Sequence, residues 1–367
     1  MLAETWTLLD VERCGQPAAL AGDWTDLVSR ALVPAGLNAP QFLCPLFTHL
    51  KSAELAVVRS DGQMVMALPV SRRRAPPALL ANWVTPLSVS GLPHLDRNLG
   101  QAALDAFLRR EAAPVMLTGI PADGPFWDAL QAAAPRLTIL DRWERAAVKP
   151  TGTFEDWFES NIDRKRRKEY RRLRTRLSEQ GKLECRSLKP GEDVEPWSSA
   201  LLDLEARGWK GARGTALKST ASLATAFAEI CRGLHDAGKL RFWSLVLDGR
   251  PIASLFAVVE GSSAWLGKIA HDETFAKFSP GVLLILDVTE AFFAEGNITS
   301  VDSCAIPNHP MIDHLWRDRL AMADVLVAAA NVGQRRFQLT AAAELLRRRT
   351  RSQARDLYYA LTRRHRS

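Results

Sequence analysis

Hydrophobic and polar residues alternate along two stretches of the chain that share one plan. Residues 55–73, LAVVRSDGQMVMALPVSRR, and 242–261, FWSLVLDGRPIASLFAVVEG, each contain two strand-like runs separated by an Asp-Gly pair. Asp-Gly between alternating runs is typical of a tight β-hairpin turn. We therefore predict a hairpin in each half of the chain, with turns at 61–62 and 248–249.

The same kinds of segment follow each hairpin in the same order: a strand-like segment, a helical pattern and a short strand. They lie at 80–91, 100–112 and 114–120 in the first half, and at 263–273, 280–296 and 299–305 in the second. A repeated order predicts a duplicated module. We expect an α/β (α+β) fold with tandem modules, each a mixed, mostly antiparallel sheet flanked by helices. Chance alternation in short strands is the alternative.

Between and after these segments the chain is strongly basic. Residues 161–182 contain ten Lys/Arg and three Asp/Glu, and residues 334–367 contain ten Arg and two acids, whereas the whole chain has a net charge of +7. The remainder is therefore acidic. A long DNA duplex, which needs a continuous positive track, is disfavoured as a partner.

Local signals divide the chain. Thr153 followed by Asp156 is typical of a helix start, and Gly181 is typical of a helix stop. The organisation we predict is an N-terminal module at 1–150, a C-terminal module at 151–333 that opens with a basic helix at 154–180, and an Arg-rich helical tail at 334–367.

Composition narrows the class of protein. The chain is 47% hydrophobic and 24% charged, as in globular proteins, and has no apolar run of the ~20 residues that span a bilayer. The start, MLAETWTLLDVERCG, lacks the pattern of a signal peptide. The five cysteines are scattered without CxxC spacing, which favours reduced thiols in the cytoplasm over a disulfide scaffold or a zinc site. We expect a cytoplasmic protein without a metal.

The segment HDETFAKFSPGVLLILDV places Ser-Pro-Gly at the start of an apolar helix. Ser279 suits the N-cap and Pro280 the first helical position. The amides of Gly281, Val282 and Leu283 would then be open to a ligand, and a helix N-terminus favours phosphate. An ordinary capped helix is the alternative.

A polar site precedes this turn in the sequence. In the strand-like AWLGKIAHD, period two places Lys268, Ala270 and Asp272 on one face, with Ile269 and His271 on the other. A lysine there is costly to bury without a partner, and Asp272 is the candidate; a lysine at an exposed strand end is the alternative.

The loop GWKGARG brackets a tryptophan and a lysine with glycines, which permits close approach of the backbone to a ligand. An ordinary helix–helix loop is the alternative. The sequence has no phosphate-binding Gly-Lys-Ser/Thr loop, no Gly-x-Ser-x-Gly elbow and no Rossmann glycine fingerprint.

The segments RKRRKEYRRLRTRLSEQG, LEARGWKGARGTAL, LVLDGRPIASLFAV, LGKIAHDETFAKFSPGVLL and DSCAIPNHPMIDHLW resemble the CelD/BcsL-type acetyltransferase family of bacterial polysaccharide operons. That family has the Gcn5-related N-acetyltransferase (GNAT) fold and is related to the Fem-like double-GNAT transferases. The resemblance is strong over about 150–320, weak over 1–150, and does not include the basic tail.

The resemblance implies an acyl-CoA-dependent N-acyltransferase that modifies an amino sugar or related amine in exopolysaccharide, cellulose or cell-envelope biosynthesis. Acetyl-CoA or a longer acyl-CoA would be the donor substrate. The residues implied at the donor are Lys277, Ser279, Pro280, Gly281, Val282 and Leu283, and those at the acceptor are Glu205, Trp209 and Lys210. The family pattern K-x-x-x-D-x-x-F-x-x-x-S-P-G is matched by Lys268 and Asp272, the implied catalytic pair.

One departure concerns the general acid. Many acetyltransferases of this fold use a tyrosine after the fifth strand, and no tyrosine follows SVDSCA here. The groups left for this role are Ser303, Cys304, His309 and His314, or a water. We take His309 as the candidate, with Asp302 facing the acceptor. The first half has no counterpart of Ser-Pro-Gly, so it would form a wall of the cleft.

Two other functions stay open. A Fem-like transferase would take its acyl group from aminoacyl-tRNA, and the basic helix could then bind the phosphate backbone. A non-catalytic scaffold of a polysaccharide machine would use residues 340–367 for peripheral contact with the anionic inner face of the membrane.

Overall fold

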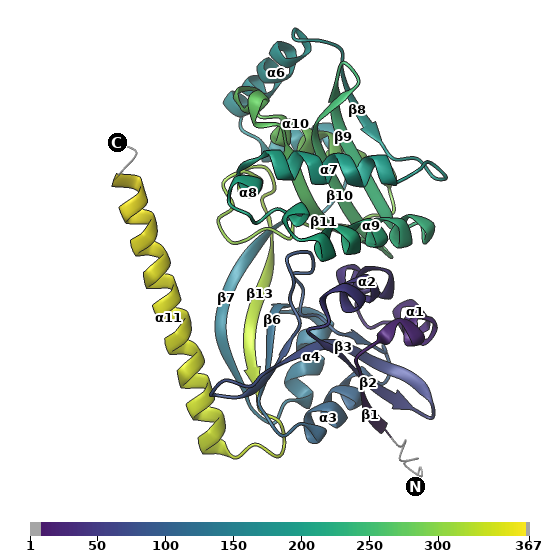
Figure 1. The fold of residues 1–367 in the computed structure, drawn as a ribbon, viewed down its shortest axis with the longest axis vertical. Coiled ribbons are helices and arrows are strands. Elements are labelled where there is room, and N and C mark those ends of the chain that lie inside the picture. The colour runs from purple at the N-terminus through teal and green to yellow at the C-terminus, as the bar shows by residue number, and fades with distance from the viewer. Residues whose placement is uncertain (1–8, 365–367) are drawn as a thin grey trace.

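The computed structural model describes residues 9–364 (Figure 1). The first half of the chain contains β1 (Leu9–Cys14), α1 (Ala21–Ser29), α2 (Pro40–Leu50), β2 (Glu54–Ser60), β3 (Gln63–Arg73), β4 (Leu79–Asn82), β5 (His94–Leu95), α3 (Gly100–Arg110), β6 (Val115–Pro121), α4 (Gly124–Ala133) and β7 (Leu137–Val148).

The second half contains α5 (Phe154–Asn161), α6 (Arg164–Ser178), β8 (Leu183–Ser187), α7 (Glu195–Arg207), α8 (Trp209–Ala212), α9 (Ala221–Asp236), β9 (Leu240–Leu247), β10 (Arg250–Glu260), β11 (Ser263–His271), α10 (Pro280–Glu295), β12 (Ser300–Asp302), β13 (Asp318–Val327) and α11 (Gln334–Arg364).

The predicted duplication is confirmed by the topology. The hairpins β2–β3 and β9–β10 form where expected, and both turns use left-handed backbone, with φ of 48° and 81° at Asp61 and Gly62 and of 49° and 79° at Asp248 and Gly249. Two consecutive positive φ values match the turn type that Asp-Gly favours. In each half a parallel pair follows, β4 with β6 and β11 with β12. The predicted α/β class with a mostly antiparallel sheet is thus confirmed.

The two halves exchange strands. All strands belong to one sheet with the order β1-β2-β3-β4-β6-β13-β7-β12-β11-β10-β9-β8, and β5 pairs with β3 off this path. β13 of the second half pairs with β6 of the first, while β7 of the first half pairs with β12 of the second. β7 and β13 pair with each other at the centre, where they join the two parts of the molecule (Figure 1). The predicted boundary near residue 150 therefore comes directly after β7, a strand from the first half of the chain that pairs with β12 in the sheet of the second half.

Helices pack on both faces of the sheet. In the second half, α7 and α9 cover one face, and α5 and α10 the other. The core under α7 and α9 continues into the first half, because Phe42 and Leu46 of α2 pack in the same cluster as Phe227 and Ile230 of α9. The two halves thus share one buried apolar layer as well as one sheet.

A buried polar network crosses between the halves. Glu260 at the end of β10 accepts a hydrogen bond from the Ala35 amide (2.9 Å), and its Oε1 lies 3.6 Å from Nε2 of His94. Trp24 donates to Nδ1 of the same histidine (3.2 Å), so Nε2 carries the proton that faces the carboxylate. His94 is fully buried. This network fixes how the first half sits against β10.

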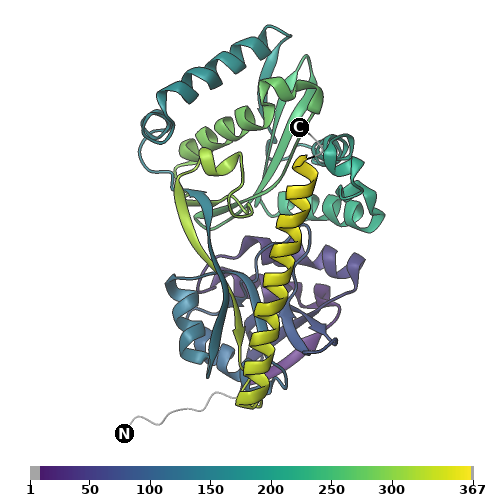
Figure 2. The same ribbon diagram turned by 90° about the vertical axis from the view of Figure 1, so that its left-hand side faces the viewer.

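The helix predicted in the Arg-rich tail forms over 334–364, and residues 365–367 lie outside the described residues. It runs along the length of the molecule beside the sheet (Figures 1 and 2). Its first turns are packed: Phe337 and Ala341 join a buried cluster, and the buried Glu344 pairs with Arg73 of β3 (2.5 Å). Contrary to the expectation of a separate tail, this part belongs to the fold. Among the described residues, no helix is both long and apolar enough to cross a membrane.

Candidate functional site

A β-bulge positions the central lysine of the site. The pairing of β10 with β11 shifts register where Gly267 and Lys268 lie opposite Phe256. A Cβ on Gly267 would come 2.2 Å from the Phe256 ring, so only glycine fits here. A bulge re-aims the side chains that follow it. As predicted from period two, Lys268 points towards α7, whereas Ile269 and His271 lie on the α10 side.

A carboxylate from α7 meets this lysine. Oε1 of Glu205 accepts from Nζ of Lys268 (2.9 Å) and from Nζ of Lys210 (3.1 Å), and Oε2 accepts from the Leu217 amide (2.8 Å). The Glu205 side chain is 1% exposed and that of Lys268 is 16% exposed. Lys268 is therefore not an exposed strand end, and the cluster of two ammonium groups on one carboxylate has a net positive charge.

Burial and neighbouring charges compete in this cluster. Burial raises the pKa of the Glu205 carboxyl, but the Leu217 amide and the two lysines outweigh it, so the pKa falls below its usual value. Burial lowers the pKa of Lys268, Lys210 lowers it further, and Glu205 opposes both without reversing the shift. The carboxylate is thus held ionised, and the ammonium of Lys268 gives up its proton more readily than a free lysine.

Asp272, expected as the partner of Lys268, makes other contacts, so the predicted pair is wrong. The chain leaves the strand after His271, and Asp272 caps the short 3-10 helix Glu273–Phe278 by accepting from Thr274 Oγ1 (2.7 Å) and N (3.0 Å). Its second oxygen pairs with Arg250 (2.5 Å). Burial raises the pKa of Asp272, but Thr274 and Arg250 outweigh it and the pKa is lowered.

The glycine-bracketed loop forms the short helix α8, which stands over the cluster. The Trp209 amide donates to Glu273 Oε1 (2.6 Å), which ties α8 to the segment after β11. The Trp209 side chain is 53% exposed, with Lys210 Nζ at 5.9 Å and Arg213 at 5.0 Å from its ring. Of the three predicted acceptor-side residues, Glu205 and Lys210 are in direct contact and Trp209 adjoins them.

His309 lies in the loop after β12, and one of its ring nitrogens stabilises that loop. Its Nδ1 accepts from the amides of Met311 (3.3 Å) and Ile312 (3.4 Å). Burial lowers its pKa, Lys210 adds to this, and Asp313 opposes it. A neutral imidazole with Nδ1 engaged carries its proton on Nε2. His309 can therefore donate a hydrogen bond, but it cannot accept a proton without releasing the loop.

Asp302 at the end of β12 makes a separate ion pair. Its Oδ2 accepts from Arg145 of β7 (3.1 Å), and its Oδ1 accepts from the Cys304 amide (2.7 Å). The side chain of Arg145 is 6% exposed. The sequence pattern did not point to this arginine, because it ends the charged stretch DRWER just before the apolar AAV.

The turn expected to hold a diphosphate differs from its prediction in detail. α10 begins at Pro280 as predicted, but Ser279 has a left-handed backbone (φ 52°) and its side chain does not cap the helix. The amides of Val282 (3.0 Å) and Leu283 (3.2 Å) both donate to the Ser279 carbonyl, so two of the three amides expected to be open are engaged.

The third amide, that of Gly281, belongs to a buried residue. A Cβ placed there would meet His271, Ile269 and the sulfur of Met311 at 3.6–3.7 Å. Lys277 beside the turn is exposed, with its Nζ 4.9 Å from the Phe278 ring. The turn therefore supplies one glycine amide and one cation, and Met311 lies over the glycine.

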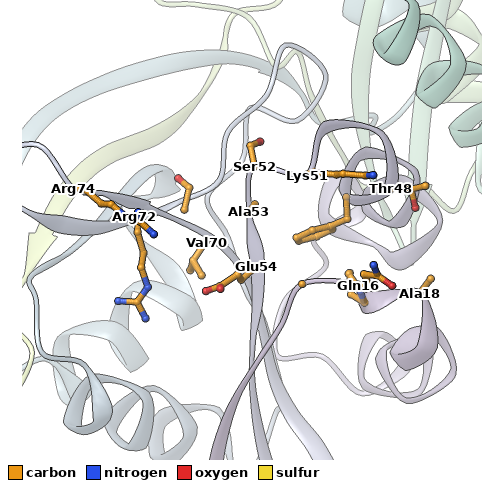
Figure 3. Close-up of a pocket in the computed structure, with 14 residues that line it drawn as sticks. Gln16, Ala18, Thr48, Lys51, Ser52, Ala53, Glu54, Val70, Arg72 and Arg74 are labelled. Carbon is orange, nitrogen blue, oxygen red and sulfur yellow. The ribbon is translucent and has the colours of Figure 1, made fainter.

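We compared the positions of two cavities with those of the predicted site residues. The larger, about 870 Å³, lies in the first half between β3 and the end of α2, where Lys51, Glu54, Arg72 and Arg74 line it (Figure 3). None of the predicted site residues is in its lining. The smaller, about 220 Å³, is lined by both halves and includes Arg145 and Asp302. Within residues 9–364, no group of three His, Cys, Asp or Glu side chains is placed to hold a metal ion.

Comparison with known proteins gives the class of the second module. The model of the family described as "Acetyltransferase (GNAT) domain" matches residues 164–309. This stretch includes Glu205, Lys210, Lys268 and the turn before α10. No curated protein matches the chain.

Several solved structures share the fold of the whole chain. FemX matches with a TM-score of 0.56 at 12% identity, covering 88% of this chain and 98% of that one. L-PGS from Bacillus licheniformis matches with a TM-score of 0.55 at 11% identity, covering 88% and 96%. The C-terminal domain of a protein described as a lysylphosphatidylglycerol synthetase, from Agrobacterium fabrum, matches with a TM-score of 0.53 at 13% identity, covering 89% and 96%.

At such low identities these structures establish the fold alone, and the family match supplies the chemistry. The chain carries an acetyltransferase (GNAT) domain over residues 164–309 and is an acyltransferase.

Proposed function

We propose that the chain transfers an acyl group from an acyl-CoA to the amine of an amino sugar, or a related amine, in exopolysaccharide or cell-envelope biosynthesis. The observation that carries the proposal is the meeting of Glu205, Lys210 and Lys268 inside the stretch that matches the acetyltransferase domain. The substrate class and the biosynthetic setting come from the resemblance to the CelD/BcsL-type family.

The protein must accept a proton from the amine, give one to the departing thiolate and stabilise the charge on the carbonyl oxygen. The amine nitrogen attacks the thioester carbon, the C–S bond breaks, the amine loses a proton and the departing thiolate takes one up. The carbonyl oxygen carries negative charge in between, and a preorganised positive group stabilises it. In our proposal the Lys268 ammonium supplies this charge and, with its lowered pKa, gives its proton to the departing thiolate; the proton that the attacking amine loses then restores the ammonium.

Glu205 then acts as a positioning residue. A carboxylate that accepts three hydrogen bonds and has a lowered pKa is a poor base. Its role is to hold the two lysines in place and to keep them charged. Trp209, half exposed, borders the cluster on the solvent side.

The donor would approach along the edge of β11. β11 pairs with β12 only from Ser263 to Trp265, and the rest of β11 continues towards the turn before α10. Acyl-CoA in this position would reach Lys277 and the Gly281 amide only after Met311 moves, because Met311 lies against that glycine.

The proposal is tested by isothermal titration calorimetry with acetyl-CoA and longer acyl-CoAs, followed by a thiol-release assay with glucosamine as acceptor. We expect saturable binding of at least one acyl-CoA and amine-dependent release of CoA. A folded protein that binds none of these thioesters would overturn the proposal.

A second donor, aminoacyl-tRNA, is favoured by one specific observation. The basic helix α6 exposes Arg164, Lys165, Lys168, Arg171 and Arg176, and none of these five forms an ion pair with another residue in the range 9–364. A row of unpaired cations attracts a phosphate backbone.

The two donors are separated by purification at low salt and by charge reversal. Co-purified tRNA that is released by salt, and lost in Lys165→Glu/Lys168→Glu, would favour aminoacyl-tRNA. The matched control is Arg349→Glu/Arg351→Glu, which reverses two exposed arginines on α11 instead. Equal loss of tRNA in both variants would indicate nonspecific attraction.

A further inference from the structure

The smaller cavity, of about 220 Å³, lies where the two halves meet. Trp265 and Ser263 line it from β11, Ser300 and Asp302 from β12, Arg145 from β7 and Phe126 from α4. Trp265 is three residues before Lys268, which places them about 10 Å apart along the strand. The cavity is smaller than the roughly 300 Å³ at which pockets for drug-sized ligands begin, so it suits a single ring.

One buried group in this cavity lacks a partner. The Arg145 guanidinium bonds to Asp302 through Nη1 (3.1 Å), but its buried Nε has no hydrogen-bond partner in the structure. The side chain is 6% exposed. A buried N–H without an acceptor is unfavourable, so a ligand that supplies an oxygen gains the bond.

The charges around the cavity limit what that ligand can be. Its charged lining consists of Arg145, Asp302 and, at the rim, the exposed Asp123, which together sum to one negative charge. A phosphate or pyrophosphate offers only acceptors and would meet this net negative lining. A hydroxylated ring offers an acceptor to Arg145 and donors to Asp302, and the uncharged lining includes the aromatic rings of Trp265 and Phe126 among aliphatic residues and serines.

We propose that this cavity binds the sugar ring of the acceptor, a neutral or amine-bearing polyol, with Arg145 and Asp302 contacting its hydroxyl groups and Trp265 lying against its face. The inference rests on the proposed acyl transfer to an amino sugar and names the place where the sugar is held. It also assigns a task to the first half of the chain, which supplies part of the wall.

The test is binding to the free full-length protein, measured by saturation-transfer NMR and calorimetry with D-glucosamine, D-glucose and inorganic pyrophosphate. We expect both sugars to bind and pyrophosphate not to compete with them. Ser263→Leu fills the cavity and should remove sugar binding. Ser262→Leu is the matched control, because Ser262 is the exposed neighbour outside the cavity and should bind as the unaltered protein does.

Arg145→Lys gives an independent reading, since it keeps the charge beside Asp302 and removes the Nε donor. We expect sugar affinity to fall roughly tenfold, as for one hydrogen bond to a charged group. Folding of each variant is checked by circular dichroism and thermal unfolding, and if Ser263→Leu does not fold, Arg145→Lys decides.

Absence of sugar binding, binding of pyrophosphate in its place, or equal losses in the two serine variants would each overturn the inference. Acyl-CoA binding is measured on the same samples. A protein that binds acyl-CoA but no sugar would contradict this inference without contradicting the proposed function.

Discussion

Glu205 on α7 and Lys268 on β11 lie 2.9 Å apart, although 63 residues separate them in the chain. The bulge at Gly267 turns the lysine towards α7, and α8 brings Lys210 to the same carboxylate oxygen. The charge of the proposed site therefore depends on three elements that meet only in the folded chain.

Replacing Glu205 by glutamine should reduce acyl transfer roughly 100-fold, because the lysines lose the charge that positions them. The pKa of Lys268 should fall further, so the alkaline limb of the kcat profile should move to lower pH. Steady-state kinetics between pH 6 and 10 measure both effects. The control is Asp203→Asn on the same helix, which removes an exposed carboxylate paired with Lys218 (2.5 Å). An unchanged pH profile in the Glu205 variant would contradict the positioning role.

Stability in acid should also depend on Glu205. Its pKa is lower in the folded than in the unfolded protein, so its contribution is present above the usual glutamate pKa of about 4.3 and is lost as pH falls towards the lowered value. Urea unfolding at pH 7 and pH 3 should therefore show a smaller acid destabilisation in Glu205→Gln than in the unaltered protein. The same slope in both proteins would exclude this carboxylate as a source of acid lability.

Asp272→Ala should affect stability more than chemistry, because Asp272 caps the 3-10 helix and contacts Arg250 instead of Lys268. We expect the free energy of unfolding to drop by about 1 kcal/mol, as for loss of a helix cap. The kcat should stay within about twofold of the original once the protein is folded. A drop in kcat as large as that of a Lys268→Met variant would show that Asp272 takes part in catalysis.

Met311→Ala should strengthen donor binding, since the methionine lies over the Gly281 position at the start of α10. We expect the Kd for acetyl-CoA to fall about fivefold, which corresponds to ~1 kcal/mol. Calorimetry measures the change, and Met116→Ala, a methionine on β6 away from this turn, is the control. Weaker binding in Met311→Ala alone would mean that the sulfur contacts the donor.

Glu260→Gln should loosen the contact between the halves. The buried Glu260 faces the Nε2 proton of the neutral His94 and also accepts from Nζ of Lys239 (3.3 Å), so glutamine leaves the lysine without its carboxylate. We expect a loss of about 2 kcal/mol in the free energy of unfolding, as for a hydrogen bond to a charged group. Denaturant unfolding measures it against Glu12→Gln, whose ion pair with Arg59 is partly exposed. Equal losses in the two variants would show that the network does not hold the halves together.

Local signals sufficed for local structure. The Asp-Gly pairs predicted both hairpins, and Ser-Pro-Gly predicted the start of α10, because in each case a few adjacent residues determine the backbone angles. The faces of β11 also followed from alternation.

Long-range partners could not be predicted in this way. Asp272 was chosen for Lys268 because it is near in the sequence, whereas the bulge and the packing of α7 select Glu205. The pairing of β7 with β13 was missed for the same reason, since nothing within a strand specifies its neighbour. The resemblance to a known family named Glu205 as a site residue but not its contact with Lys268.

The strand exchange sets a condition on how this enzyme can be produced and altered. A chain cut after residue 150 would leave β7 in a fragment whose sheet needs β13, and β13 in a fragment whose sheet needs β7. Each fragment alone would carry an unpaired sheet edge, which promotes aggregation. Only when both fragments are synthesised in the same cell could they re-form the molecule, by complementation.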